Sequence, residues 1–395
     1  MVAKNHNVLI LILAIGIFSI LNTEVGIIGI LPLMAEKFGV DITQAGLLVS
    51  LFALIIAVAG IIMPLVFSGF NRKKVMLTVL TIFAVCNLVA AFAPNFTVVL
   101  IARLIPAFAH PVYCSLAFVV AASLVEPKDV PKAISKVMMG VSAGIVIGIP
   151  VTSFIANTFS YQTAMLFFTL MNIIALILTT VMIPSMLVKE RVSYGSQLSV
   201  LKDSITWMSL FTVSAIGASL FAAYAYIAQY LEEISHITGD NLSLALFLFG
   251  CTSILGNFIA GRLLSSSPIK TAVMYPIIFS IVYLLIFVFG EYSIVMVPII
   301  FFWGMLNGIG NNIQQYWIMS AIPKAPDFAN GLFISFGNLG TTIGTFAGGM
   351  ILAGMGTHYT VFGGIFFLVL TWISVLLRNI IYAKPQKAEE GQVGA

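Results

Sequence analysis

The stretch SILNTEVGIIGILP, residues 19–32, places the carboxylate Glu24 inside a long run of apolar residues. The whole chain shares this character, because 60% of its 395 residues are hydrophobic and only 8% are charged, with a mean hydropathy of +1.10. Water-soluble domains carry about 25% charged residues, so lipid is the expected solvent for most of this chain. A carboxylate at that depth needs either a structural partner or a function.

Long unbroken apolar runs favour membrane-spanning helices over the alternating pattern of a β-barrel. A hydrocarbon core of about 30 Å requires about 20 apolar residues per helix. On that measure the sequence predicts twelve spans, at 8–34, 44–69, 75–93, 97–124, 132–157, 163–188, 206–231, 241–264, 270–290, 293–321, 328–353 and 359–382.

The positive charges lie almost entirely on one side of these spans, with Lys37 on the other side and Arg103 within a span. The positive-inside rule then places both termini and the central loop in the cytoplasm. The net charge of +4 and the pI near 8.9 therefore reflect topology, and no nucleic-acid partner is expected. All three cysteines fall in apolar runs, so the sequence supports neither a disulfide framework nor a metal site.

The two halves of the chain resemble each other. A shift of 196 residues lays EPKDVPKA (126–133) on IPKAPDFA (322–329), and the polar stretch KERVSYGSQLSVLKDS (189–204) falls between the halves. Duplicated six-helix bundles are typical of transporters with a site at the repeat interface. We therefore expect an all-α integral membrane protein with twelve transmembrane helices in two pseudo-symmetric six-helix bundles. The expected parts are an N-terminal bundle at 1–188, a cytoplasmic linker at 189–205, a C-terminal bundle at 206–383 and a cytoplasmic tail at 384–395.

Four stretches also match motifs of a known family: NTEVGIIGILP (22–32), ARLIPAFAHPVYCSLA (102–117), GVSAGIVIGIP (140–150) and AAYAYIAQYLEE (222–233). The chain resembles the major facilitator superfamily, and more narrowly its drug:proton antiporter-1 family, on the branch of bacterial sugar and purine-nucleoside efflux proteins. The resemblance implies a structural antiporter motif at Gly140, Gly144, Gly148 and Pro150. One departure is the loop at 63–77, which keeps the family's cations but lacks its acidic residue.

Three ionisable residues are the candidates for proton coupling. Arg103 and His110 are seven residues apart, so they share one face of a helix. At 1.5 Å per residue Glu24 lies about 15 Å from the outer end of its span, and the other two bracket that depth at about 9 and 20 Å. We expect Glu24 to carry the proton, Arg103 to tune it and His110 to relay it. The alternatives are His110 as the proton site, a static Glu24–Arg103 pair that holds helices together and an Arg103 that snorkels to the headgroups.

The most polar intramembrane stretch is NGIGNNIQQYW, residues 307–317. Amides offer donors and acceptors without charge, which suits a neutral solute such as a sugar or nucleoside. The alternative is that these amides join helices. The predicted substrate-binding residues are Asn22, Tyr226, Tyr230, Asn307, Asn311, Gln314 and Gln315.

The leading hypothesis is a monomeric, proton-coupled secondary transporter in the bacterial inner membrane that exports a small organic solute. It needs no cofactor or metal, because the proton gradient supplies the energy. A multidrug antiporter with an apolar pocket is the main alternative, since 31 Phe and 17 Met offer adaptable surface. A channel and an intramembrane enzyme are less consistent with the sequence, because no filter stretch, HExxH motif or Ser/His/Asp set lies in the spans.

Overall fold

The computed structural model describes residues 6–40, 42–186 and 198–382, which are helical throughout apart from short turns and contain no strand. Most of the predicted linker and the whole of the predicted tail at 384–395 lie outside these ranges. The described residues include twelve helices of 20 residues or more: α1 (His6–Gly26), α3 (Ile42–Phe67), α4 (Arg72–Ala91), α5 (Phe96–Ser123), α6 (Val130–Thr158), α7 (Tyr161–Met182), α9 (Ser204–Tyr224), α11 (Gly239–Ser266), α12 (Pro268–Phe289), α13 (Ser293–Ala321), α14 (Pro326–Met355) and α15 (Thr360–Tyr382).

Eleven of these helices are long and apolar enough to cross a membrane. The remaining one, α14, has 30 residues, so its composition and not its length sets it apart. Its sequence contains stretches such as GNLGTTIGT (337–345), in which glycine, threonine and asparagine replace aliphatic residues. The predicted all-α membrane fold is confirmed.

Two predicted spans are wrong as single helices, because each is interrupted near its C-terminal end. The first, at 8–34, becomes α1, a 3₁₀ turn η1 (Ile27–Ile30) and a short helix α2 (Leu31–Phe38). The seventh, at 206–231, becomes α9 and α10 (Ile227–Glu233). The break in the first span falls between Gly26, which ends α1, and the proline in the first turn of α2, where a proline costs no internal hydrogen bond.

Several helix starts follow from local sequence. The side chain of Asn71 accepts a hydrogen bond from the Lys74 amide at the start of α4, and Asn95 does the same for the Val98 amide in α5. Such N-caps satisfy amides that the helix leaves without an internal partner. The remaining short elements are η2 (Pro127–Asp129), η3 (Val200–Lys202) and η4 (Thr357–Tyr359).

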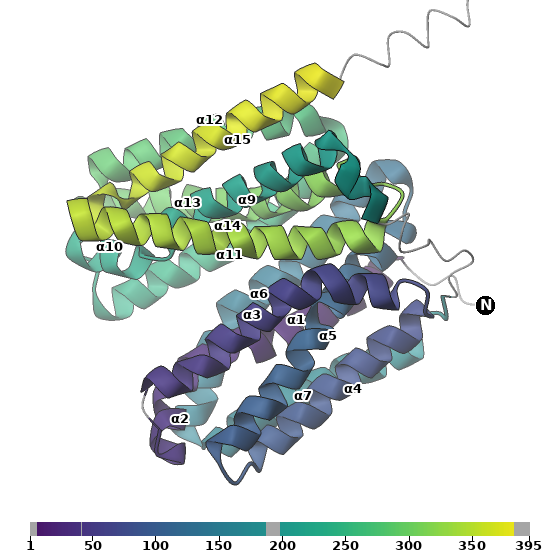
Figure 1. The fold of residues 1–395 in the computed structure, drawn as a ribbon. Coiled ribbons are helices and arrows are strands. Elements are labelled where there is room, and N and C mark those ends of the chain that lie inside the picture. Colours follow the sequence, from purple (N-terminus) through teal and green to yellow (C-terminus); the bar gives the residue numbers. More distant parts are fainter. Residues whose placement is uncertain (1–5, 41, 187–197, 383–395) are drawn as a thin grey trace, which may run out of the picture. The chain divides into compact units, whose positions relative to one another are not determined.

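The described residues form two compact units, each of which is considered by itself. The first contains α1 to α7 together with residues 325–335 at the start of α14, and the second contains α9 to α13, the rest of α14 and α15 (Figure 1). In the first unit α1 packs on α6 and α7, and α4 packs on α7. In the second unit α9 packs on α15 and α13, and α11 packs on α13. Each unit buries large aromatic side chains, including Phe83 and Tyr113 in the first and Tyr283 and Trp303 in the second.

The repeat seen in the sequence extends to the helices. α4 starts at Arg72 and α12 at Pro268, while α6 starts at Val130 and α14 at Pro326, so both pairs are offset by 196 positions. The glycines of α6 lie against α1, where a Cβ on Gly140 would collide with the backbone of Ala14. The glycines of α14 lie in the same way against α9, where a Cβ on Gly340 would collide with the backbone of Ser214. Close helix packing at small residues therefore occurs in both halves.

Candidate functional site

The end of α1 is held by Arg103, which projects from α5. Because α1 stops at Gly26, the carbonyl groups of its last turn have no amide partner further along the same helix. Arg103 donates from Nη1 to the carbonyl oxygen of Thr23 at 3.1 Å and from Nη2 to that of Glu24 at 3.1 Å. Its Nε donates to the carbonyl oxygen of Leu48 on α3 at 3.2 Å. The guanidinium group thus joins the broken end of α1 to α3.

Two alternatives for Arg103, snorkelling and a static ion pair with Glu24, do not fit this geometry. Its residue exposure is 3%, so it does not snorkel to the headgroups. Its hydrogen bonds go to main-chain carbonyls, and no ion pair between Arg103 and the Glu24 carboxylate occurs among the described residues. A guanidinium group presents several donors in a fixed fork, which explains why it can bind three carbonyls on two segments at once. Arg103 therefore positions the backbone of Glu24.

The carboxylate of Glu24 instead contacts His110. Oε2 of Glu24 lies 2.9 Å from Nε2 of His110, with side-chain exposures of 24% and 7% respectively. His110 lies two turns beyond Arg103 on α5, so a single helix holds both the backbone and the side chain of Glu24. Phe52 packs against both, with its ring 4.9 Å from the guanidinium carbon and edge-on to the imidazole. The structure thus brings together all three residues predicted for proton coupling.

A polar cluster next to Glu24 was missed by the sequence analysis. The hydroxyl of Thr23 accepts hydrogen bonds from Asn87 Nδ2 on α4 at 3.1 Å and from Asn172 Nδ2 on α7 at 3.0 Å. It donates to the carbonyl of Ser19 at 3.1 Å, and the Ser19 hydroxyl in turn donates to Asn172 Oδ1 at 3.3 Å. All four side chains are buried. The only signal in the sequence was an isolated asparagine in each of two apolar runs, 75–93 and 163–188.

Asn22, predicted to bind substrate, is buried where α1 meets α6. A Cβ on Gly148 would lie 2.7 Å from Asn22 Oδ1, so the glycine leaves room for the amide. Both amide atoms of Asn22 are buried without a hydrogen-bond partner among the described residues. Pro150 follows within α6. Asn22 therefore lies inside the first unit, one residue before the Thr23 cluster.

The amides of α13 point to several different neighbours. Asn307 donates to the Ser253 hydroxyl of α11 at 3.1 Å, and Asn312 donates to Asn257 Oδ1 of α11 at 2.7 Å. These two match the helix-joining alternative. Gln314 donates to Asn311 on its own helix at 3.4 Å, while Gln315 is buried.

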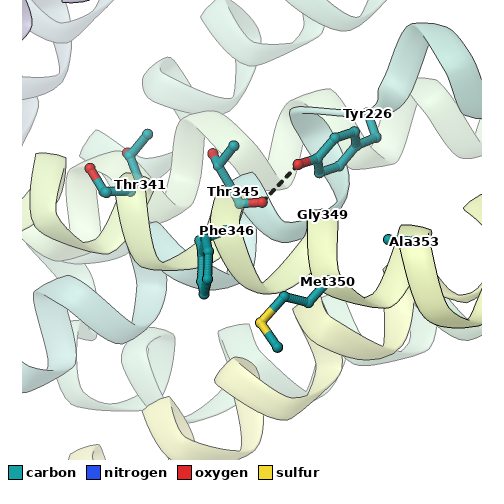
Figure 2. Close-up of a pocket in the computed structure, with 8 residues that line it drawn as sticks. Tyr226, Thr341, Thr345, Phe346, Gly349, Met350 and Ala353 are labelled. Carbon is teal, nitrogen blue, oxygen red and sulfur yellow. Dashed lines mark hydrogen bonds between the residues drawn. The ribbon is translucent and has the colours of Figure 1, made fainter.

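The second unit contains an open cavity of about 680 Å³ (Figure 2). Its lining residues are Tyr226, Thr341, Thr342, Thr345, Phe346, Gly349, Met350 and Ala353. Of the residues predicted to bind substrate, only Tyr226 lines it. Tyr230 instead lies buried in α10 and donates to the carbonyl of Ile286 at 2.9 Å.

The start of α14 supplies an acid that the loop at 63–77 lacks. Asp327 Oδ2 lies 3.8 Å from Arg72 Nη2 at the start of α4. The carbonyl oxygen of Asp327 also accepts a hydrogen bond from the Ser115 hydroxyl of α5 at 2.8 Å. Arg72 is therefore paired with an acidic residue that lies far along the sequence.

Two repeated sets of six membrane-length helices, each with polar side chains buried inside it, define a multi-pass membrane protein of the transporter class. The family model described as Major Facilitator Superfamily matches residues 13–326, and the chain belongs to this superfamily. The predicted superfamily is thus confirmed.

Relatives and solved structures agree with this assignment. The "Uncharacterized MFS-type transporter YtbD" of Bacillus subtilis is 30% identical over 368 residues, covering 91% of this chain and 92% of that protein. The "Probable sugar efflux transporter" of Helicobacter pylori is 23% identical over 370 residues, covering 92% and 94%. The fucose:proton symporter of Escherichia coli has the same fold, with a TM-score of 0.74, 16% identity and coverage of 93% and 98%.

Proposed function

We propose that this protein exports a small neutral polar solute in exchange for protons, and that Glu24 carries the coupled proton with His110 as its partner. The observation that carries the proposal is the 2.9 Å contact between Glu24 Oε2 and His110 Nε2 inside the first unit. Intramembrane ionisable residues are costly and are usually retained for function.

A carboxylate and an imidazole in contact form a pair that can gain and lose a proton as a unit. With one proton the pair is either an ion pair or a neutral acid beside a neutral imidazole, and with two it carries a net positive charge. Solvation and neighbouring charges set which state is favoured. Alternating exposure of the pair to the two sides of the membrane would change its solvation, so it would take up a proton on one side and release it on the other.

The polar side chains Asn311, Gln314 and Tyr226 support a neutral solute, because they offer hydrogen bonds without charge. A relative named as a sugar efflux transporter is consistent with that class and with export. We further propose that one chain is sufficient, that the solute leaves chemically unchanged and that the protein works in the cell membrane.

The test uses purified protein in proteoliposomes, with radiolabelled D-glucose, adenosine and the cationic dye ethidium as probes. A proton antiporter accumulates its solute in vesicles with an acidic lumen, whereas a proton symporter requires an acidic exterior. We expect accumulation of glucose or adenosine in acid-lumen vesicles, recovered unmodified by chromatography. Accumulation of ethidium alone would favour the multidrug alternative.

Glu24→Gln keeps the side-chain shape and removes the titration. This variant should still exchange solute at equal pH but should not accumulate it against a gradient. Glu36→Gln is the matched control, because Glu36 is exposed on α2. Gradient-driven accumulation by Glu24→Gln would overturn the assignment of Glu24.

A further inference from the structure

The α14 face that lines the cavity in the second unit carries three threonine hydroxyls among apolar side chains. Seven of the eight lining residues come from this helix, between Thr341 and Ala353, and they form one stripe at helical spacing. The helix is also the long one whose composition falls short of that expected for a membrane span. Polar side chains at membrane depth are tolerated where they face protein or a water-filled cavity. The stripe therefore fits the wall of an aqueous cavity.

The direction of this stripe is fixed by packing on its neighbouring face. Gly340, Gly344 and Gly348 lie against the backbone of α9, at Ser214, Ala218 and Ala222. Each of these glycines packs against α9. The residue that follows it, Thr341, Thr345 or Gly349, therefore lies on the neighbouring face of α14 and lines the cavity. The α14 residues that line the cavity are thus held in place by a tight helix contact, which favours a preformed binding site.

Tyr226 lines the cavity from the break between α9 and α10. Its hydroxyl donates to the carbonyl of Thr345 at 2.8 Å, as Figure 2 shows. A Cβ on Gly349 would lie 2.6 Å from that hydroxyl oxygen, so a glycine is needed for this approach. The phenol oxygen keeps acceptor capacity after donating to the carbonyl.

The threonine hydroxyls of the wall are not equivalent. Helical threonines in this protein commonly donate to the carbonyl four residues earlier, as Thr342 does to Asn338 at 3.0 Å and Thr371 does to Phe367 at 2.9 Å. Within the described residues, the hydroxyls of Thr341 and Thr345 donate to no protein acceptor. They remain available to a ligand.

We infer that this cavity is a solute-binding subsite that takes a neutral hydroxylated ring compound, such as a sugar or the ribose of a nucleoside. The inference rests on the proposed function and names the residues that would contact its substrate. Phe346, which is 70% exposed, offers an aromatic face to the ring, while Thr341 and Thr345 bond its hydroxyl groups. The eight lining side chains carry no charge, which disfavours an ionic ligand. The volume lies in the range of about 300–1,000 Å³ that is usual for small-molecule sites.

The first experiment asks whether the wall faces water or lipid. Phe346→Cys is made in a background where Cys86, Cys114 and Cys251 are replaced by alanine. A charged methanethiosulfonate reagent reacts with the thiolate, which needs water. We expect Phe346→Cys to be labelled and Ile281→Cys, a 52% exposed position on α12, to remain unlabelled. If neither cysteine is labelled, the α14 face of the cavity is in contact with lipid and the inference is overturned.

The second experiment measures the KM for counterflow of whichever probe, D-glucose or adenosine, the wild type transports. A lost hydrogen bond to a ligand costs about 1–3 kcal/mol, so Thr341→Val and Thr345→Val should each raise KM about tenfold. Phe346→Leu should raise it as well. Thr371→Val on α15 is the matched control, because this hydroxyl bonds the Phe367 carbonyl and does not line the cavity, so its KM should stay within about twofold of wild type.

The outcomes separate this inference from the proposed function. Wild-type KM in Thr341→Val, Thr345→Val and Phe346→Leu, with normal pH-driven transport, would overturn the subsite alone. An equal loss in Thr371→Val would mean that the effect is not specific to the cavity, which also overturns it. A wild type that transports neither glucose nor adenosine would overturn the proposed solute class, and the subsite with it.

Discussion

Glu24 and His110 face each other across α1 and α5, with Oε2 of the carboxylate 2.9 Å from Nε2 of the imidazole. The same α5 helix carries Arg103, which bonds the carbonyl of Glu24. The side chain and the backbone of Glu24 are therefore both held by one neighbouring helix. This arrangement couples any movement of α5 to the environment of the Glu24 carboxylate.

The role of Arg103 as a positioning residue predicts a strong difference between arginine and lysine. Arg103→Lys keeps the charge, but a single ammonium group cannot reproduce a fork that binds carbonyls on α1 and α3. We expect a loss of about 2 kcal/mol or more in stability, seen as a lower Tm in detergent, together with slower solute exchange. Unchanged Tm and exchange in Arg103→Lys would instead mean that charge alone matters.

The hydroxyl of Thr23 is expected to hold three helices together. Thr23→Val keeps the shape and removes the acceptor for Asn87 and Asn172. A buried amide left without its partner costs about 1–3 kcal/mol, so the Tm should fall. Thr169→Val on α7 is the control, because the buried Thr169 hydroxyl bonds only its own helix, at the Met165 carbonyl. Equal effects of the two variants would contradict a special role for the cluster.

The pair formed by Arg72 and Asp327 predicts a charge-swap result. The side chains of Arg72 and Asp327 are 22% and 12% exposed and their charged atoms lie 3.8 Å apart, so the loss of one partner leaves a largely buried charge unpaired. Asp327→Arg places two cations together and should lower the Tm. Adding Arg72→Asp should restore it, because the Ser115 bond reaches the Asp327 main chain and survives both changes. A double variant no more stable than Asp327→Arg would show that the ion pair is unimportant.

The charge distribution along the chain predicts its orientation. In the cysteine-free background, Glu126→Cys and Tyr292→Cys lie at exposed turns, with 72% side-chain and 60% residue exposure respectively. A membrane-impermeant maleimide should label Tyr292→Cys in intact cells and Glu126→Cys only after permeabilisation. The reverse pattern would invert the topology inferred from the positive-inside rule.

Part of the candidate site could be predicted because it depends on positions along single helices. Glu24, Arg103 and His110 stand out as ionisable residues in apolar runs, and their helical spacing placed two of them on one face. Their pairing could not be predicted in this way. The predicted spans treated 8–34 as one helix, whereas the break after Gly26 frees the carbonyls that Arg103 binds. The same holds for the amides of α13, because the hydrogen bond from Asn307 to Ser253 on α11 could not be predicted from positions along α13 alone.

Hydropathy, charge placement and repeated motifs are properties of the chain, so the membrane environment of this protein, the number of its long helices, the duplication of its halves and its superfamily could all be predicted from the sequence. Three features depend on tertiary packing: His110 and not Arg103 meets the Glu24 carboxylate, Thr23 joins three helices, and Thr341 and Thr345 line a cavity. The physical reason is that a side chain's partner depends on where helices break and on how neighbouring helices are rotated and aligned, and those are set by packing between residues far apart in the sequence.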